Sequence, residues 1–514
     1  MESDPINCYD HPMPSIRLHP DDNVVIAREK LAAGTEIPNE RVVLREGVPA
    51  GHKLATRAIA NGESVVKGGL AIGRANGAIE PGDRVDARNL RRDEGLLGAE
   101  AAPRVTALRP SRQPVTFRGI VRDDGRVATR NYIVIAVTVN CAATTARKIA
   151  EHFTPERLAA YPNVDGVVAL THELGCGMEM TGEPMDLLRR TIAGTVRHAN
   201  AGAALLCSLG CERNNVYKLV EAQNLVTGPR LRTLVMQEKG GTQKTIDEGI
   251  AAIESMLPAV NDVRRESVPV EHLVVGMQSS GADAFSQASA NPALGAAIDL
   301  VIANGGTAIL SGTADLAGME SALIARAASS EIADKLARRL EWWKRYNAGR
   351  DTPLNGRMAP AQAAGGFTTP VERAIAAAAR WGHAPLAEVY EYAHPVAAKG
   401  LVFMDTPSHE AVAATGQIAG GANLVCMVAG HGTGFGSLPA PTLKLASESS
   451  MFRRMQDDLD VDCGPVLDGD VSVEEMGRRI FESILEHASG RKTKAEELGV
   501  GESEFVPWPI GLTA

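Results

Sequence analysis

The stretch NYIVIAVTVNC at residues 131–141 is a short apolar run that ends in a cysteine. The same arrangement recurs at 164–176 and at 201–211, with an interval of 35 residues from one cysteine to the next. A run rich in Val, Ile and Ala predicts a buried strand, and about 30 residues or more is the length of one strand–helix–strand unit. The repeat therefore predicts three parallel strands whose ends lie side by side at one edge of a sheet.

The three cysteines are Cys141, Cys176 and Cys211. Open α/β sheets bind ligands at the carboxyl ends of their strands, and three thiols that meet there could hold iron, as a single ion or as a cluster. The alternative is that each cysteine is a small buried residue in a tight turn, because Cys is among the most buried residue types.

Length and composition describe an ordinary globular protein. A chain of 514 residues corresponds to roughly three domains, and 44% hydrophobic and 22% charged residues are typical values. The net charge of −9 argues against a nucleic-acid binder or a protein of anionic membrane surfaces. It does not argue against a small anionic substrate, because local cations and helix N-termini set the field of a pocket.

Cysteine usage and the absence of targeting signals predict a cytoplasmic protein. The seven cysteines show no paired spacing, which favours a reducing compartment. The first residues are acidic and polar, unlike a signal peptide, and no apolar stretch reaches the ~20 residues of a membrane helix.

The pattern divides the chain into four segments. Residues 14–90 carry short apolar runs cut by Gly and Pro, which predicts an all-β domain. Residues 91–114 mix charges, alanines and three prolines without periodicity and are typical of a linker. Residues 115–268 and 269–514 alternate strand and helix patterns, which predicts two α/β segments with parallel sheets, the last one doubly wound.

Polar residues at the cysteine turns are candidates for catalysis. His172 and Glu212 could act as acid–base groups or complete a metal shell, and Asn214, in the same turn as Glu212, is a candidate substrate-binding residue. Glu212 could equally be a helix-start residue that complements the dipole. Just before the first strand, Arg130 and Asn131 could bind a carboxylate, Arg bidentately, unless the Arg is an ordinary surface residue.

The all-β segment offers a second set of candidates. In PAGHKLA at 49–55, His52 and Lys53 could serve as proton donor and carboxylate anchor, although a solvated turn explains the pair equally well. His19 carries a similar ambiguity as a contact for the substrate carboxylate. We expect this domain to close over the cysteine edge, because the linker of about 25 residues permits movement.

The sequence lacks the common motifs for nucleotide binding and for a serine nucleophile. The Gly-rich turn GHGTGFG at 430–436 could cradle an anion with its backbone N–H groups. It is not a GxGxxG motif with a ribose-binding acid in the expected context, so a dinucleotide site is not predicted. The sequence holds neither a Walker A motif nor a Gly-x-Ser-x-Gly elbow.

Taken together, the motifs resemble the family of altronate and galactarate dehydratases over nearly the whole chain. The matching stretches, in order, are HPDDNV (19–24), AGHKLA (50–55), DGRVATRNYIVI (124–135), TVNC (138–141), THELGCGM (171–178), SLGCERN (208–214), GGT (240–242), ANPALG (290–295), NGGT (304–307), GGFTT (365–369), MDTP (404–407) and MQDDLD (455–460).

This resemblance implies an N-terminal SAF-type β-clip domain, a linker, a middle domain that can dimerise and a Rossmann-like C-terminal domain. It implies a hydro-lyase that removes water from a small anionic hydroxylated sugar acid to give a 2-keto-3-deoxy acid. The cofactor implied is iron, as Fe²⁺ or an iron–sulfur cluster, or another divalent cation such as Mn²⁺. The expected assembly is a homodimer without nucleic-acid or membrane partners.

Four turns depart from the family pattern. Ser279 replaces a usual Cys, Gly312 a usual Glu, Asp86 a usual His, and His431 a usual Arg. The changes put the substrate in question more than the reaction class. The alternatives are elimination of sulfite or an amine from a related hydroxy acid, or a sugar-acid-binding homologue without activity.

Overall fold

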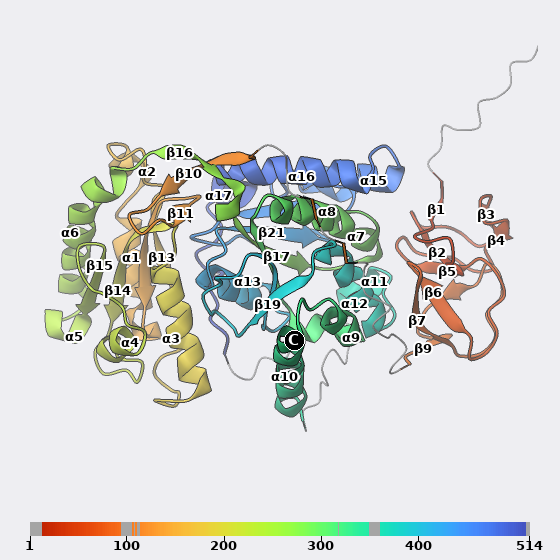
Figure 1. The fold of residues 1–514 in the computed structure, drawn as a ribbon, viewed down its shortest axis with the longest axis horizontal. Helices are drawn as coiled ribbons and strands as arrows, with labels where there is room; N and C mark the ends of the chain where they lie inside the picture. The colour runs from red at the N-terminus through yellow and green to blue at the C-terminus, as the bar shows by residue number, and fades with distance from the viewer. Residues whose placement is uncertain are drawn as a thin grey trace, which may run out of the picture.

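The computed structural model describes residues 13–93, 105–106, 108–109, 114–316, 318–348 and 360–509. Three bodies lie in a row, with the C-terminal domain between the middle domain and the N-terminal β domain (Figure 1). Most of the segment at 91–114 lies outside the described residues. Every helix in the described part of the chain is too short or too polar to span a bilayer.

The N-terminal domain is built of short antiparallel strands, as the Gly and Pro punctuation predicts. A four-stranded sheet has the order β1-β2-β5-β8, made of β1 (Ser15–Ile16), β2 (Val24–Ala27), β5 (Lys53–Ala55) and β8 (Arg84–Val85). The other strands are β6 (Ser64–Lys67), β7 (Leu70–Ala75) and β9 (Leu90–Arg91), which form a second sheet, and the hairpin β3 (Glu36–Ile37) with β4 (Val42–Val43).

The middle domain contains the three strands expected from the repeat. Its parallel sheet has the order β13-β12-β14-β15, made of β12 (Tyr132–Val137), β13 (Gly166–Leu170), β14 (Ala201–Ser208) and β15 (Leu231–Val235). The strands are apolar throughout because helices cover both faces of the sheet. The principal helices are α1 (Ala143–Glu151), α3 (Glu183–Val196), α4 (Val216–Ala222) and α6 (Thr242–Asn261).

A small sheet that the sequence analysis missed closes this domain. Its order is β11-β10-β16, from β10 (Thr116–Val121), β11 (Val127–Ala128) and β16 (Arg265–Pro269). Because β10 and β16 pair antiparallel, the first and last segments of the middle domain lie side by side.

The C-terminal domain is a doubly wound parallel sheet of seven strands. The order is β19-β20-β18-β17-β21-β22-β23, made of β17 (Val274–Ser280), β18 (Thr307–Leu310), β19 (Leu386–Tyr390), β20 (Gly400–Met404), β21 (Leu424–Ala429), β22 (Thr442–Ala446) and β23 (Val461–Asp462). The chain starts at β17, places β18, β19 and β20 on one side, and then returns to add β21, β22 and β23 on the other side. The carboxyl end of β17 is therefore at the topological switch point, where such sheets bind ligands.

Four helical segments surround the carboxyl edge of this sheet: the 3₁₀ turn η4 (Thr313–Leu316), α11 (Pro360–Ala364), α12 (Pro370–Ala378) with its 3₁₀ continuation η5 (Ala379–Trp381), and α13 (Glu410–Ala419). Thr369 caps α12, since its hydroxyl accepts the N–H of Glu372. The same hydroxyl donates to the carbonyl of Ile72 on β7 at 2.7 Å, which ties the helix to the N-terminal domain.

The N-terminal domain packs against the C-terminal domain through a buried charge cluster. The ammonium groups of Lys53 and Lys67 lie 3.0 and 2.6 Å from the Glu372 carboxylate, and all three side chains are 0–1% exposed. This arrangement corrects the expectation that the β domain closes over the cysteine edge. In the structure it contacts the C-terminal domain, on the side away from the middle domain (Figure 1).

Candidate functional sites

Three loops meet at the carboxyl edge of the middle sheet, and each carries one of the three cysteines. The N–H of Asn140 donates to the carbonyl of Leu174 at 3.2 Å. The N–H of Asn214 donates to the carbonyl of Gly175 at 3.0 Å. Gly175 has a φ of +107°, and a Cβ there would lie 2.2 Å from the carbonyl oxygen of Thr138. Glycine is therefore required for the loops to approach this closely.

The three thiols are free and exposed at this edge. The Sγ of Cys211 accepts a hydrogen bond of 3.4 Å from Nε2 of Gln237. Thiolate is the donor that iron favours, and the hydrogen-bonded loops hold the three cysteines at one edge. Among the described residues, however, no three His, Cys, Asp or Glu side chains are grouped as a metal site. The donor type fits iron, whereas the three thiols are not grouped as a ligand set in this structure.

Glu212 ties the cysteine loops together. Its carboxylate accepts hydrogen bonds from the Thr138 hydroxyl at 2.5 Å, from the Gly210 N–H at 2.6 Å, and from the Ser208 hydroxyl. Burial alone would raise the pKa of Glu212, but these hydrogen bonds outweigh burial and hold the pKa below its ordinary value. The group is therefore an ionised acceptor whose lone pairs are largely occupied.

His172 is also committed to the loop structure. Its Nε2 lies 3.0 Å from the carbonyl of Val137, and its Nδ1 accepts the N–H of Leu174 at 3.1 Å. Burial lowers the pKa of His172 to about 4, so the ring is neutral at pH 7. His172 also borders a cavity of about 470 Å³, whose other lining side chains include Thr171, Glu173, Arg147 and Phe505.

The remaining candidates of the middle domain make structural contacts. Asn214 donates from Nδ2 to the carbonyl of Thr138 at 3.1 Å. Asn131 lies at the amino end of β12, opposite the cysteines, and its Nδ2 donates to the carbonyls of Asn163 and Val260.

Arg130 precedes β12 at the same amino end and is 1% exposed. It binds Glu496 bidentately at 2.6 and 2.8 Å and donates to the carbonyls of His487 and Arg491. The structure therefore does not bring Arg130 or Asn131 to the cysteine edge.

A second pocket lies at the carboxyl edge of the C-terminal sheet, at the switch point. Its volume is about 270 Å³. The lining residues come from the end of β17, from η4, from α11 and α12 with η5, and from the turn before α13: Ser279, Gly281, Ala282, Asp315, Gln362, Arg373, Ala377, Arg380, Ser408, His409 and Glu410.

Two buried arginines distinguish this pocket. Arg373 and Arg380 are 8% and 5% exposed. Arg373 Nη2 lies 3.1 Å from Oδ1 of Asp315, and its Nη1 donates to Gln362 at 3.4 Å. The Nε atoms of both arginines have no hydrogen-bond partner within the described residues. Desolvation lowers the pKa of Arg380, with Asp315 acting in the opposite direction, yet guanidinium stays charged at neutral pH.

Hydroxyl and acid–base groups lie beside the arginines. The hydroxyls of Ser279 and Ser408 are buried and find no partner among the described residues. Glu410 begins α13, and its Oε1 accepts the Ser280 hydroxyl at 3.3 Å. His409 caps the same helix and is exposed. The pocket therefore combines cations, hydroxyl groups and a carboxylate within one small volume.

Three of the four turns that depart from the family pattern lie at this second edge, and the fourth lies in the β-clip domain. Ser279 and Asp315, three residues after Gly312, line the pocket. A Cβ on Gly281 would lie 3.4 Å from Cδ2 of His431. Asp86 follows Val85, which pairs with Lys53 across the β-clip sheet. None of these turns belongs to the cysteine loops.

The β-clip candidates lie near the second edge. A Cβ on Gly366 would lie 3.2 Å from the backbone N of His52, so His52 is next to the loop that precedes α12. His52 is partly buried, and burial lowers its pKa. Lys53 donates to Glu372, to the Gly366 carbonyl and to the Thr368 hydroxyl, so its ammonium serves a carboxylate of the protein itself.

His19 lies in a turn of the same domain. Its Nδ1 accepts the N–H of Asp21 at 3.2 Å and lies 3.6 Å from the Asp21 carboxylate. The histidine is therefore engaged with its own turn.

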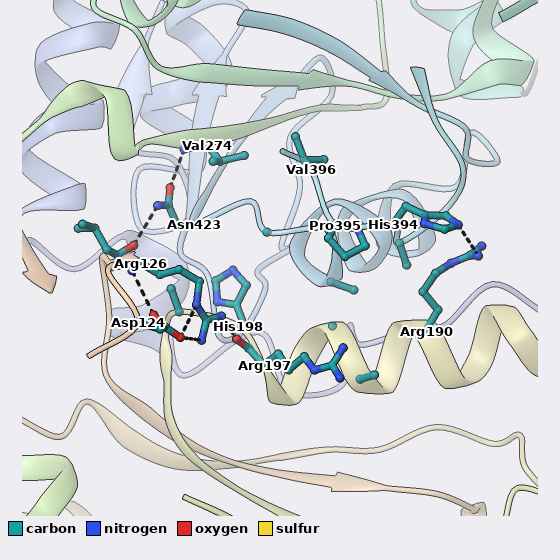
Figure 2. A pocket seen from close by; sticks show the side chains of 18 of the residues that line it. Asp124, Arg126, Arg190, Arg197, His198, Val274, His394, Pro395, Val396 and Asn423 are labelled. Carbon is teal, nitrogen blue, oxygen red and sulfur yellow. Dashed lines mark hydrogen bonds and ion pairs between the residues drawn. The ribbon is translucent and has the colours of Figure 1, made fainter. Parts of the chain in front are cut away.

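A larger cavity of about 780 Å³ lies at the interface of α3 with the C-terminal domain (Figure 2). Its cations are engaged: Arg190 donates to the Tyr392 carbonyl and lies 2.7 Å from Nε2 of His394, while Arg126 binds Asp124. Figure 2 shows the Arg190–His394 and Arg126–Asp124 contacts. It lies away from both carboxyl edges, and we regard it as part of the domain interface.

Sequence reasoning missed Arg373 and Arg380. They are seven residues apart on α12 and its continuation, so they share one face of an Ala-rich helix. The one sequence signal for this pair was that two arginines follow the matched GGFTT stretch at helical spacing. Two arginines on a solvent-exposed helix face would show the same spacing.

Three family models match consecutive parts of the chain. They are the altronate/galactarate dehydratase SAF domain (residues 13–93), the D-galactarate dehydratase/altronate hydrolase second domain (119–261) and the D-galactarate/altronate dehydratase C-terminal domain (270–513).

Two curated relatives are similar over almost the whole chain, and a third over about three quarters of it. Altronate dehydratase of Escherichia coli is 31% identical over 94% of this chain and 96% of its own length. Galactarate dehydratase (L-threo-forming) of Escherichia coli is 32% identical over 96% of this chain and 97% of its own length. The (2R)-sulfolactate sulfo-lyase subunit beta of Chromohalobacter salexigens is 28% identical over 76% of this chain and 96% of its own length.

Proposed function

Because the chain belongs to the family of altronate and galactarate dehydratases, we propose that it eliminates water from a small hydroxylated sugar acid to give a 2-keto-3-deoxy acid. As a member of this family it is a hydro-lyase. The structural observation that carries the proposal is the pocket at the switch point of the C-terminal sheet. This pocket unites two arginines with the carboxylates of Asp315 and Glu410, and α12, which carries Arg373, also contacts the docked β-clip domain through Glu372.

The groups of this pocket suit the chemistry of dehydration. A base must take the proton from the carbon α to the carboxylate, and positive charge must stabilise the enediolate that develops. Glu410 is the candidate base, and the arginines supply the charge. The β-hydroxyl leaves with a proton as water, for which His409 or His52 is the candidate donor. The enol product then ketonises without further help from the protein.

Turnover of candidate acids tests the reaction class. Reduced protein supplied with Fe²⁺ is incubated separately with D-altronate, D-galactarate and sulfolactate, and the products are followed by 2-keto acid assay and mass spectrometry. We expect a 2-keto acid lighter than its substrate by one water from at least one sugar acid. If sulfolactate were the only acid to react and released sulfite, the proposed reaction would be elimination of sulfite and not dehydration. Binding without any product would instead support a sugar-acid-binding homologue.

We propose separately that Cys141, Cys176 and Cys211 hold iron, with Mn²⁺ or another divalent cation as the alternative. The support is the exposure of all three thiols on hydrogen-bonded loops at one sheet edge. Bound iron would supply Lewis-acid chemistry. The cysteine edge and the arginine pocket belong to different domains, so no step of the reaction is assigned to the metal.

Metal analysis tests the cysteine site. Iron and sulfide per chain are measured after anaerobic purification of the wild type, Cys176→Ser and the same-loop control Met178→Leu. We expect the serine variant to lose iron and the control to keep it. Equal iron content in the wild type and Cys176→Ser would overturn the assignment, and sulfide separates a cluster from a single ion.

We propose further that the protein acts in the cytoplasm as a homodimer, without nucleic-acid or membrane partners. Support comes from the cysteine usage and net charge of the sequence. Light scattering of the purified full chain tests the assembly, and a monomer at all concentrations would contradict it.

A further inference from the structure

We propose that Arg373 and Arg380 together bind a carboxylate of the substrate in the pocket at the carboxyl edge of the C-terminal sheet. The inference rests on the proposed dehydratase function and adds which side chains hold the acid. It also identifies which region of the molecule selects the substrate.

The energetic argument starts from the burial of the two cations. Arg373 and Arg380 lie more than nine-tenths buried, and Asp315 is the carboxylate nearest to Arg373. Leaving a buried cation incompletely paired is costly, because desolvation is not offset by hydrogen bonds. An anion bound between the two guanidinium groups would supply the missing acceptors.

The chemistry of the donors favours a carboxylate. Guanidinium presents a planar fork that matches the two oxygens of a carboxylate. Asp315 pairs with Arg373, whereas Arg380 has no carboxylate within ion-pair distance among the described residues, so its guanidinium can pair with a carboxylate of the ligand.

The remaining lining favours a hydroxylated molecule. The unpartnered hydroxyls of Ser279 and Ser408 can bind hydroxyl groups of a sugar acid. A volume of about 270 Å³ is below the ~300–1,000 Å³ of drug-sized ligand pockets and suits a compact substrate.

The neighbouring residue links this site to the β-clip domain. Glu372 is adjacent to Arg373 on α12 and accepts both Lys53 and Lys67 from the β-clip domain. Docking of the β-clip domain therefore fixes the first turn of the helix that presents Arg373. This makes Glu372 a positioning residue and the two arginines the binding residues.

Calorimetric titration tests the proposal with three probes: D-galactarate, D-altronate and the uncharged polyol galactitol. The proteins are the wild type, Arg373→Met, Arg380→Met, Arg380→Lys and, as a matched control, the exposed Arg478→Met on α16 (Val473–Ala488). We expect each Met variant to weaken binding of the acid by about 10- to 100-fold. Arg380→Lys should recover part of the loss, the control should match the wild type, and galactitol should bind weakly to all proteins.

The thermal midpoint without ligand distinguishes binding from a purely structural role. If the arginines serve the ligand, removal of the Arg380 cation, which has no ion-pair partner among the described residues, leaves the midpoint unchanged or raises it. If they serve the fold, the midpoint falls in the Met variants. A fall together with unchanged affinity for both acids would overturn the proposal.

Turnover separates this inference from the proposed function. Acid binding that depends on the arginines, without any 2-keto product, would uphold the site and overturn the dehydratase activity. Normal kcat/KM in Arg380→Met would overturn the site and leave the dehydratase activity standing. Inorganic sulfate is a further probe: sulfate that binds as tightly as the sugar acids and in competition with them would reduce the site to a general anion site and overturn its assignment to a carboxylate.

Discussion

The two parallel sheets end in edges that look alike in topology and differ in how their polar groups are paired. At the middle sheet, the carboxylate of Glu212 accepts hydrogen bonds from three donors within its own loops, and the three thiols are exposed. At the C-terminal sheet, arginine and serine atoms are buried without hydrogen-bond partners among the described residues.

The difference shows which edge is prepared for an anion. A satisfied network rigidifies its loops and offers little to a ligand beyond what remains exposed. A buried cation without hydrogen-bond partners raises the free energy of the unbound protein, and binding of a matching anion offsets that cost. The first edge therefore suits a soft metal held by thiols, and the second suits the acid group of a substrate.

The largest effect is expected where the β-clip domain docks beside the second edge. Glu372→Gln removes the charge that pairs two buried ammonium groups, and breaking such a pair costs about 3–5 kcal/mol. Urea unfolding measures the loss, with Glu388→Gln as the control because Glu388 pairs with the more exposed Lys335 and should cost under about 1 kcal/mol. Equal losses in both variants would remove the distinction between a buried and an exposed pair.

A methyl group at Gly175 should disrupt the first edge. Gly175→Ala forces a strained φ and a clash with the Thr138 carbonyl, with an expected cost of about 2–4 kcal/mol. Gly177→Ala, in the same turn, has no atom within 4 Å of the added Cβ and should have little effect. If both variants unfold at the same urea concentration as the wild type, the close packing of the cysteine loops is not important for stability.

The buried His172 should make the first edge sensitive to acid. Its pKa of about 4 lies below the ordinary 6.5, so the folded protein binds fewer protons than the unfolded chain between these values. The stability it contributes is complete above pH 6.5 and is lost as the pH falls toward 4. Between pH 7 and pH 5 the loss is about 2 kcal/mol.

Variants isolate this contribution. His172→Gln should unfold with a pH dependence reduced by that amount, whereas His152→Gln, at a more exposed histidine, should keep the wild-type dependence. Urea unfolding at the two pH values gives the comparison. An unchanged dependence in His172→Gln would show that the histidine is not held neutral by the fold.

The smallest effects compare two serines at the two edges. Ser208→Ala removes a hydroxyl that donates to the Glu212 carboxylate and should cost about 1.5–3 kcal/mol. Ser279→Ala removes a buried hydroxyl without a partner among the described residues, and its stability should stay within about 0.5 kcal/mol of the wild type. A larger loss at Ser279 than at Ser208 would reverse the comparison between the edges.

Local patterns were sufficient to predict the elements that carry the first edge. The apolar runs and their regular spacing predicted β12, β13 and β14 as neighbouring parallel strands with the cysteine turns at one end. Short runs cut by Gly and Pro predicted the all-β domain. The small sheet of β10 and β16 escaped prediction, because its strands are about 150 residues apart in sequence.

The sequence by itself therefore determined the all-β segment, the cysteine-bearing strands and which residues could carry chemistry at strand ends. Hydrophobic periodicity is local, so it can be read from the chain alone. Only the tertiary structure decided what each polar side chain meets. Lys53 pairs with Glu372, which lies 319 positions further along the chain, whereas Arg373 and Arg380 are buried with incomplete hydrogen bonding. Charge pairing depends on which distant segments pack together and exclude water, so the sequence alone does not show it.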